Sequence, residues 1–139
     1  MSPETKKLLR KREPDRQKIK SLIESAKTTM RIVKSIPLDD TSAALIFRET
    51  YESIRQLGDA GWWIQGYETS SHDISMQSLT GLDIKEKLKL NRLDRFRRIR
   101  NDINYRGFKA TITQANEILD FWDSCAKEII KILDKSSTS

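Results

Sequence analysis

The residues best suited to chemistry in this 139-residue chain lie between Arg92 and Gly107, in the segment RLDRFRRIRNDINYRG. Five arginines fall within the first nine residues of that segment. A guanidinium can give two parallel hydrogen bonds to phosphate oxygens, so this density predicts a face that contacts phosphate groups. A basic, solvated helix surface is the alternative interpretation, and composition alone does not separate the two.

Arg100 favours the functional interpretation. On a helical wheel it falls at the margin of the apolar arc, beside Phe96 and Leu93, with Asn104 one turn further along. A guanidinium at that margin is partly buried against another helix or a second subunit. Because burying a charge is unfavourable unless the charge has a partner, we expect Arg100 to have a partner or a functional role.

The scarce residue types exclude several classes of site. The chain has one cysteine, Cys125, and one histidine, His72, so no intrachain disulfide can form. A structural zinc site would need a carboxylate-rich ligand set that such sites rarely use. Glycine-rich motifs of the GxxxxGK[ST] or GxGxxG type do not occur in the sequence. We therefore expect no metal and no cofactor, and Cys125 is expected to be a small core residue.

The helices that position these residues must pack around a hydrophobic core. The chain is long enough to form one such core without a stabilising disulfide or metal ion. Its 26 Lys and Arg against 20 Asp and Glu give a net charge of +6, which suits a polyanionic partner. No apolar run approaches the roughly 18 residues of a membrane span. The N-terminal segment also lacks the apolar stretch of a secretory signal. We expect a cytoplasmic protein with no membrane partner.

Apolar residues recur at helical spacing in five segments, and no segment alternates convincingly as a strand does. The pattern predicts an all-α fold, an up-and-down bundle of four long helices and one short helix over residues 14–135. Residues 1–13 are predicted to be a flexible basic lead-in and residues 136–139 a disordered tail. The predicted helices run from Pro14 to Pro37, from Asp39 to Gly66, from Ser70 to Gly81 (the short one), from Asp83 to Gly107 and from Thr111 onward.

Three details of these helices are open to test in the structure. Gly58 and Gly61 lie inside the second helix and indicate either close packing against another helix or a break. The helix from Asp83 is expected to bury Leu88, Phe96, Ile99 and Ile103. The three tryptophans could stack on bases, but their positions on helical stripes favour a place in the core.

Two segments resemble the HEPN (higher eukaryotes and prokaryotes nucleotide-binding) domain family. One is RRIRNDINYRG near the end of the penultimate helix, and the other is GYETSSHDISMQSL, where a long helix ends and a short one begins. Together with the helix order, the resemblance covers most of the chain from about Asp15 onward. It implies a metal-independent endoribonuclease of the toxin type, acting at a cleft between two subunits, with a nucleotidyltransferase as protein partner.

The resemblance assigns roles by position. Arg100 matches the arginine of the family motif, Asn101 the polar residue, and Tyr105 falls where the family has a histidine. Four further residues of the segment are expected to contact substrate: Arg97, Asp102, Asn104 and Arg106.

The tyrosine changes the expected chemistry. Cleavage of RNA without a metal must activate a ribose 2′-OH and protonate the leaving oxygen, which suits a group with a pKa near 7. Tyrosine, with an ordinary pKa near 10, can donate a proton but is a poor base at neutral pH. His72 is a second candidate for proton transfer, although a structural role at the start of the short helix is the stronger expectation for it.

Three functions therefore stay open. The first is a HEPN-like homodimer that binds RNA and cleaves it weakly. The second is a catalytically inactive interaction module that binds a nucleotidyltransferase or a nucleotide. The third is general binding of nucleic acid through release of counterions, which needs no motif.

Overall fold

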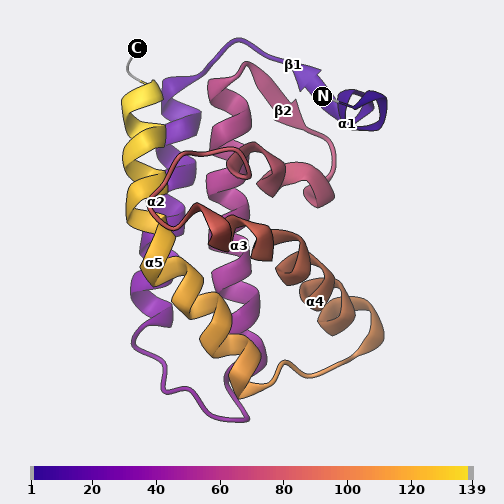
Figure 1. Ribbon diagram of the computed structural model, residues 1–139, viewed down its shortest axis with the longest axis vertical. Helices are drawn as coiled ribbons and strands as arrows, with labels where there is room; N and C mark the ends of the chain where they lie inside the picture. The colour runs from indigo at the N-terminus through magenta and orange to yellow at the C-terminus, as the bar shows by residue number, and fades with distance from the viewer. Residues whose placement is uncertain (1, 138–139) are drawn as a thin grey trace.

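The computed structural model describes residues 2–137, and within that range the chain is mostly helical (Figure 1). The all-α class predicted from the apolar stripes is therefore shown, with a small two-stranded ribbon added to it. The elements in chain order are α1 (Pro3–Lys7), β1 (Leu9–Lys11), α2 (Arg16–Val33), α3 (Ala43–Ile64), β2 (Tyr67–Thr69), the 3-10 helices η1 (His72–Leu79) and η2 (Lys87–Arg92), α4 (Leu93–Arg106) and α5 (Ile112–Ser137).

Side chains cap the N-terminal ends of α2 and α5. The Asp15 carboxylate accepts a hydrogen bond of 3.1 Å from the backbone N–H of Lys18 and so caps α2. At the start of α5 the side chains of Thr111 and Gln114 each accept a 3.0 Å bond from the other residue's backbone N–H. This reciprocal pair forms a capping box, which the sequence Thr111-Ile-Thr-Gln114 itself indicates.

Three long helices, α2, α3 and α5, run side by side and enclose the core (Figure 1). The apolar stripe of α2 from Ile19 to Val33 is buried, apart from Leu22, which is half-buried against the core. Phe96 of α4 enters the core between α3 and α5, with ring centroids 6.1 Å from Phe47 and 5.7 Å from Phe121, both edge to face. Beyond Phe96, α4 slants away from the other helices, so it is an appendage of a three-helix core and not a fourth full-length member.

The glycines of α3 allow close packing, which answers the question that the sequence left open. The helix continues unbroken from Ala43 to Ile64. A Cβ atom on Gly58 would lie 2.3 Å from the backbone oxygen of Ser75 in η1. One on Gly61 would lie 2.4 Å from the hydroxyl of Ser78. Because α3 has no side chains at these points, η1 packs directly on its backbone.

The lead-in over residues 1–13, predicted from the sequence to be flexible, forms the helix α1 and the strand β1 within its described part. Residues of β1 pair antiparallel with β2, with Arg10 opposite Glu68. The backbone N–H of Arg12 also donates to the carbonyl of Gly66 at 2.8 Å. At the other end α5 extends to Ser137, and the last two residues of the predicted tail lie outside the described part.

The predicted helix from Asp83 to Gly107 forms over only its second half. Turns and the 3-10 helix η2 precede α4, and Leu88, expected in the core, is 79% exposed. Ile99 and Ile103 are half-buried against the core, as the apolar arc predicted. Gly107 ends α4 in the left-handed conformation, with φ of 69°. In residues 2–137, no helix combines the length and the apolar character that crossing a membrane requires.

Candidate functional site

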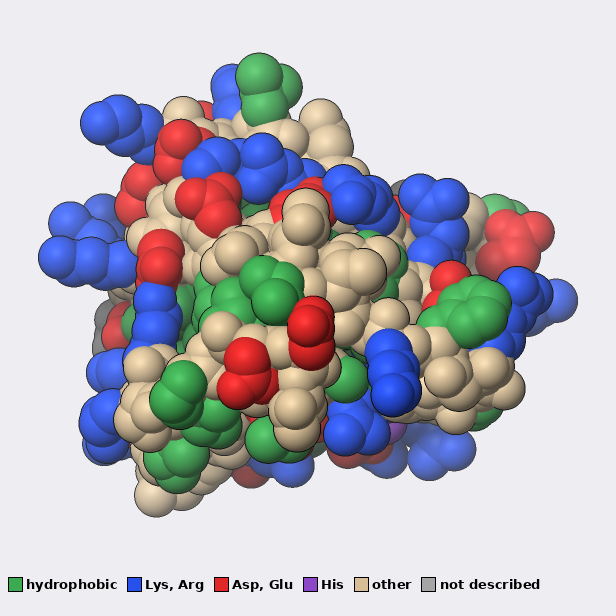
Figure 2. Space-filling model, turned by 90° about the horizontal axis from the view of Figure 1, so that it is seen from below, with side chains coloured by type: hydrophobic (Ala, Val, Ile, Leu, Met, Phe, Trp, Pro, Cys, Tyr) green, Lys and Arg blue, Asp and Glu red, His purple; other side chains and the backbone are tan. Residues whose placement is uncertain are grey.

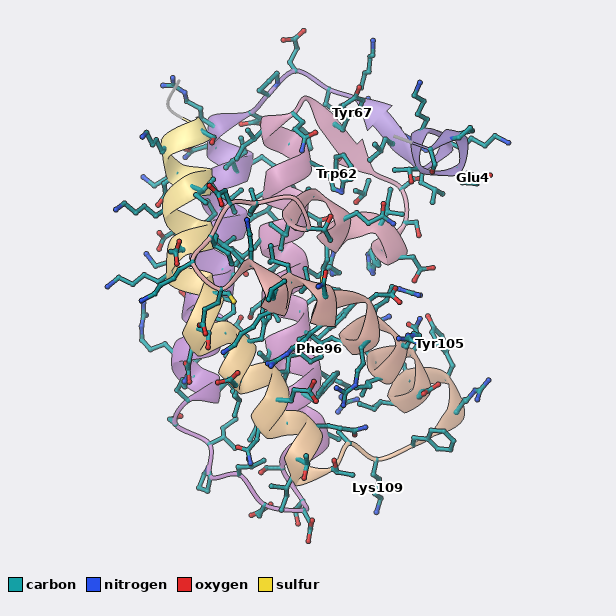
Figure 3. The ribbon with its side chains drawn as sticks, in the orientation of Figure 1. Glu4, Trp62, Tyr67, Phe96, Tyr105 and Lys109 are labelled. Carbon is teal, nitrogen blue, oxygen red and sulfur yellow. The ribbon has the colours of Figure 1, made fainter. Side chains whose placement is uncertain are left out.

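The site is built on α4, which two buried side chains anchor to the core. Leu93 and Phe96 are the fully buried residues of this helix, and both lie in its first turn. The remaining turns lie against α3 on one side and face solvent on the other. Tyr105 lies on the outer part of α4, far from α2 and α5 (Figure 3).

Most arginines of the predicted basic cluster have carboxylate partners. Arg97 lies 3.0 Å from Asp94 and 3.6 Å from Asp73, and the other ion pairs are 2.5 to 3.8 Å long. Figure 2 shows Lys and Arg side chains spread over the underside of the molecule, with acidic side chains among them. The cluster is thus largely neutralised. The other pairs are Arg92–Asp120, Arg95–Glu117, Arg98–Asp94 and Arg106–Asp102.

Arg100 differs from these neighbours. It is half-buried, and no carboxylate of residues 2–137 lies within 4.0 Å of its guanidinium. Its Nη1 atom lies 3.5 Å from Oδ1 of Asn101, and its Cζ atom lies 5.6 Å from the centroid of the Tyr51 ring. A ring face attracts a cation but does not neutralise it. Arg100 therefore keeps a positive charge that is free to meet an anion.

Tyr51 is the platform beneath this guanidinium. Its side chain is 2% exposed and comes from the middle of α3. Burial raises the pKa of the Tyr51 phenol above its ordinary value, and the nearby charges of Arg100 and Arg97 oppose only part of that rise. The phenol is consequently neutral at physiological pH and supports Arg100 through its ring.

An open hollow of about 500 Å³ brings Arg100 together with residues far away in the sequence. It is lined by α4 on one side and by the segment that joins β2 to η1 on the other. This hollow unites the three residues assigned from the family motif with the separate candidate His72. Its lining residues are Ser70, Ser71, His72, Asp73, Arg100, Asn101 and Tyr105.

The wall opposite α4 is held by hydrogen bonds to the N-terminal segment and within η1. Ser70 donates to the carbonyl of Leu8 both from its backbone N–H, at 2.8 Å, and from its hydroxyl, at 3.0 Å. The Ser71 hydroxyl accepts a 3.2 Å bond from the N–H of Asp73 and caps η1. Sequence reasoning did not assign either serine to the site, although the Ser-Ser pair before His72 was recognisable as a cap.

None of the four residues predicted to contact substrate lines the hollow. Arg97 lies on α4 and forms an ion pair of 3.6 Å with Asp73, which lines the opposite wall of the hollow. Asp102 pairs with Arg106 at 3.8 Å and accepts a backbone bond from Phe108 at 3.3 Å. Asn104 and Arg106 are exposed on the outer part of α4.

The residues of the hollow combine charged groups with several groups that can donate or accept hydrogen bonds. They supply one guanidinium without an ion pair, one imidazole, one phenol, the Asp73 carboxylate, which pairs with Arg97, and several neutral hydrogen-bonding groups. In the described range, no three His, Cys, Asp or Glu side chains gather closely enough to hold a metal ion. Comparison of the chain with models of protein families, with curated proteins and with solved structures finds no match.

Proposed function

We propose that this chain is a HEPN-like RNA-binding protein, and that the hollow at Arg100 holds the RNA backbone and supports weak, metal-independent cleavage. The observation that carries the proposal is the unpaired, half-buried Arg100 in one hollow with His72 and Tyr105. A fixed guanidinium is a strong ligand for phosphate because it needs little reorganisation on binding. The sequence resemblance, described above, supports the same function.

The cleavage step assigns one role to each group. The ribose 2′-oxygen attacks the adjacent phosphorus while His72 accepts its proton, and the bond from phosphorus to the 5′-oxygen breaks. Tyr105 donates its phenolic proton to the departing 5′-oxygen, which leaves a 2′,3′-cyclic phosphate. Arg100 stabilises the negative charge that grows on the non-bridging oxygens. A phenol is a weak acid compared with imidazolium, and the reaction is slow for this reason.

Binding is tested with fluorescein-labelled single-stranded RNA and fluorescence anisotropy. Arg100→Ala is expected to weaken binding about 10- to 100-fold, because a charge-assisted hydrogen bond contributes roughly 1.5–3 kcal/mol. Arg98→Ala is the matched control, since Arg98 lies on the same helix, is 66% exposed and does not line the hollow. Equal losses in the two variants would show that only general basic charge is involved.

Cleavage is tested separately, with end-labelled RNA in the presence of EDTA. His72→Ala and Tyr105→Phe are expected to abolish product formation and to change RNA affinity less than threefold. Binding without cleavage by the wild-type protein would assign the chain to the non-catalytic alternative. Cleavage that persists in His72→Ala would refute the role of the imidazole.

Dimer formation through the outer part of α4 belongs to the same proposal. Tyr105 is 78% exposed and Phe108 is 56% exposed, so the end of this helix presents two aromatic side chains to solvent. A second subunit placed there would cover them and would bring two Arg100 side chains into one cleft. Light scattering is expected to show a dimer at micromolar concentration, and a strict monomer would contradict this placement.

A further inference from the structure

A second concave surface lies between α2 and α5 and shares no residue with the hollow at Arg100. This α2–α5 groove encloses about 470 Å³. Its lining residues fall at i, i+3, i+4 and i+7 on α2, so they form one face of that helix over about 11 Å. The groove is lined by Lys27, Met30, Arg31 and Lys34 from α2 and by Trp122, Asp123, Ala126, Lys127 and Ile130 from α5.

The α2–α5 groove combines apolar side chains with an excess of positive charge. Four cations line it against one carboxylate, Asp123. Its apolar residues include the indole of Trp122, which is half-buried and packs against both clusters of the core. A volume of this size, with a mainly apolar lining and a few charged groups, is typical of sites for small molecules.

Two of the four cations have no carboxylate partner. Lys34 pairs with Asp123 across the groove, and Lys27 lies 3.6 Å from Glu24 on its own helix. Arg31 on α2 and Lys127 on α5 have no ion pair with any residue of the described range. Arg31 and Lys127 carry positive charges on the two walls of the groove, so they repel each other. An anion between them reduces this repulsion.

We propose that the α2–α5 groove binds a small ligand that carries a flat aromatic ring and an anionic group. The ring packs on the indole of Trp122, beside Met30, and the anionic group lies between Arg31 and Lys127. An indole offers a broad π-face for stacking, and a neighbouring guanidinium favours an electron-rich ring over an aliphatic chain. Nucleoside monophosphates and aromatic carboxylates both have this chemistry.

Isothermal titration calorimetry with four ligands tests the requirement for both parts. Adenosine monophosphate and 2-naphthoate carry a ring and an anion, inorganic phosphate lacks the ring, and adenosine lacks the anion. At least one aromatic anion is expected to bind about tenfold or more tightly than phosphate and adenosine, which corresponds to one favourable contact. Binding of the monophosphate alone identifies a nucleotide site, and binding of both anions identifies a site for aromatic acids in general.

Paired variants then locate the binding. The double variant Arg31→Gln, Lys127→Gln is expected to weaken binding at least about tenfold, since it removes both charges that the ligand meets. Lys20→Gln, Lys131→Gln is the matched control, because both lysines are exposed on the same two helices and do not line the groove. All four side chains are exposed, so neither double variant is expected to unfold the protein.

Four results of these titrations would overturn the proposal, and loss of binding in Arg100→Ala would be a fifth. The four are the absence of saturable binding by either aromatic anion, equally tight binding of phosphate alone, equally tight binding of adenosine, and unchanged affinity in the Arg31, Lys127 double variant. Arg100→Ala is included so that the two sites stay distinguishable. Binding that disappears in this variant would place the ligand in the hollow on α4 instead, whereas unchanged binding supports the α2–α5 groove whatever the RNA assays show.

Discussion

Replacing Gly58 with alanine is the sharpest test of how the fold holds the wall of the hollow. The new Cβ would lie 2.3 Å from the carbonyl oxygen of Ser75, 2.7 Å from its carbonyl carbon and 2.9 Å from Cα of Met76. All three are backbone atoms, so no side chain can rotate away to relieve the contact. The 3-10 helix η1, which begins at His72, must therefore shift away from α3.

The magnitude follows from two opposing terms. Overpacking of a close contact costs about 1–3 kcal/mol, and contact with fixed backbone belongs at or above the upper end. Alanine in a helix interior regains about 1 kcal/mol over glycine. We expect a net loss of roughly 2 kcal/mol in the free energy of unfolding. With an unfolding entropy of about 2.1 cal/mol/K per residue, this loss lowers Tm by about 7 °C.

The assay is urea denaturation followed by circular dichroism at 222 nm, with thermal melts in parallel. Gly81→Ala is the matched control, because nothing lies within 4 Å of the Cβ position at Gly81. The control is expected to stay within about 0.5 kcal/mol of wild type. Refutation would be a Gly58→Ala protein as stable as wild type or more stable, since helix propensity alone would then act and η1 could not be packed on α3.

The remaining predictions concern single contacts. Cys125 is fully buried, and burial raises the pKa of its thiol, so iodoacetamide is expected to leave it unmodified in the native protein and to label it in 6 M urea, as mass spectrometry would show. A hydrogen bond from Lys89 lowers the pKa of Asp120 below its unfolded value, so the stabilisation that this carboxylate gives is present above about pH 4 and is lost as the pH falls through the folded-state pKa. Asp120→Asn should accordingly lower stability at pH 7 and converge with wild type in acid, as urea titrations across this range would measure. Trp62→Phe removes the 2.9 Å bond to the carbonyl of Ile74 and is expected to lose about 1–3 kcal/mol of stability in the same assay.

The sequence predicted the helices whose buried face follows directly from the helical spacing of their own apolar residues. The stripe of α2 from Ile19 to Val33 is buried except for the half-buried Leu22, and the capping box at Thr111 forms. In these segments the spacing of apolar residues and the capping side chain act over a few residues. Local pattern is sufficient there because the helix carries its own buried face.

The sequence failed where structure depends on partners far along the chain. The strand β1 exists because Leu9 to Lys11 pair with residues almost sixty positions away, and nothing in those three residues marks them as a strand. Leu88 falls on the apolar arc of the helix predicted from Asp83. The chain around it forms turns and a 3-10 helix instead, so the residue is exposed. Tertiary context overrode the helical pattern in both places.

The sequence indicated individual residues of the candidate site but not which of them the fold brings together. The position of Arg100 at the margin of the apolar arc correctly indicated a half-buried guanidinium. The wheel could not show that its neighbours on α4 would find carboxylates from other elements, such as Glu117 for Arg95. It also could not place His72 in the same hollow, because that depends on how η1 packs against α3 and α4.

The two-stranded ribbon of β1 and β2 holds one wall of the hollow on α4 in place. The helix α1 buries no residue, and two strands of three residues form a marginal unit, so we expect this segment to open at a free energy well below that of global unfolding. Ser70 is tied to Leu8 by both of its hydrogen bonds, and each opening therefore releases one side of the hollow. If the proposed RNA binding requires the closed wall, RNA would shift this equilibrium by mass action, and the amides of β1 would then exchange with deuterium more slowly.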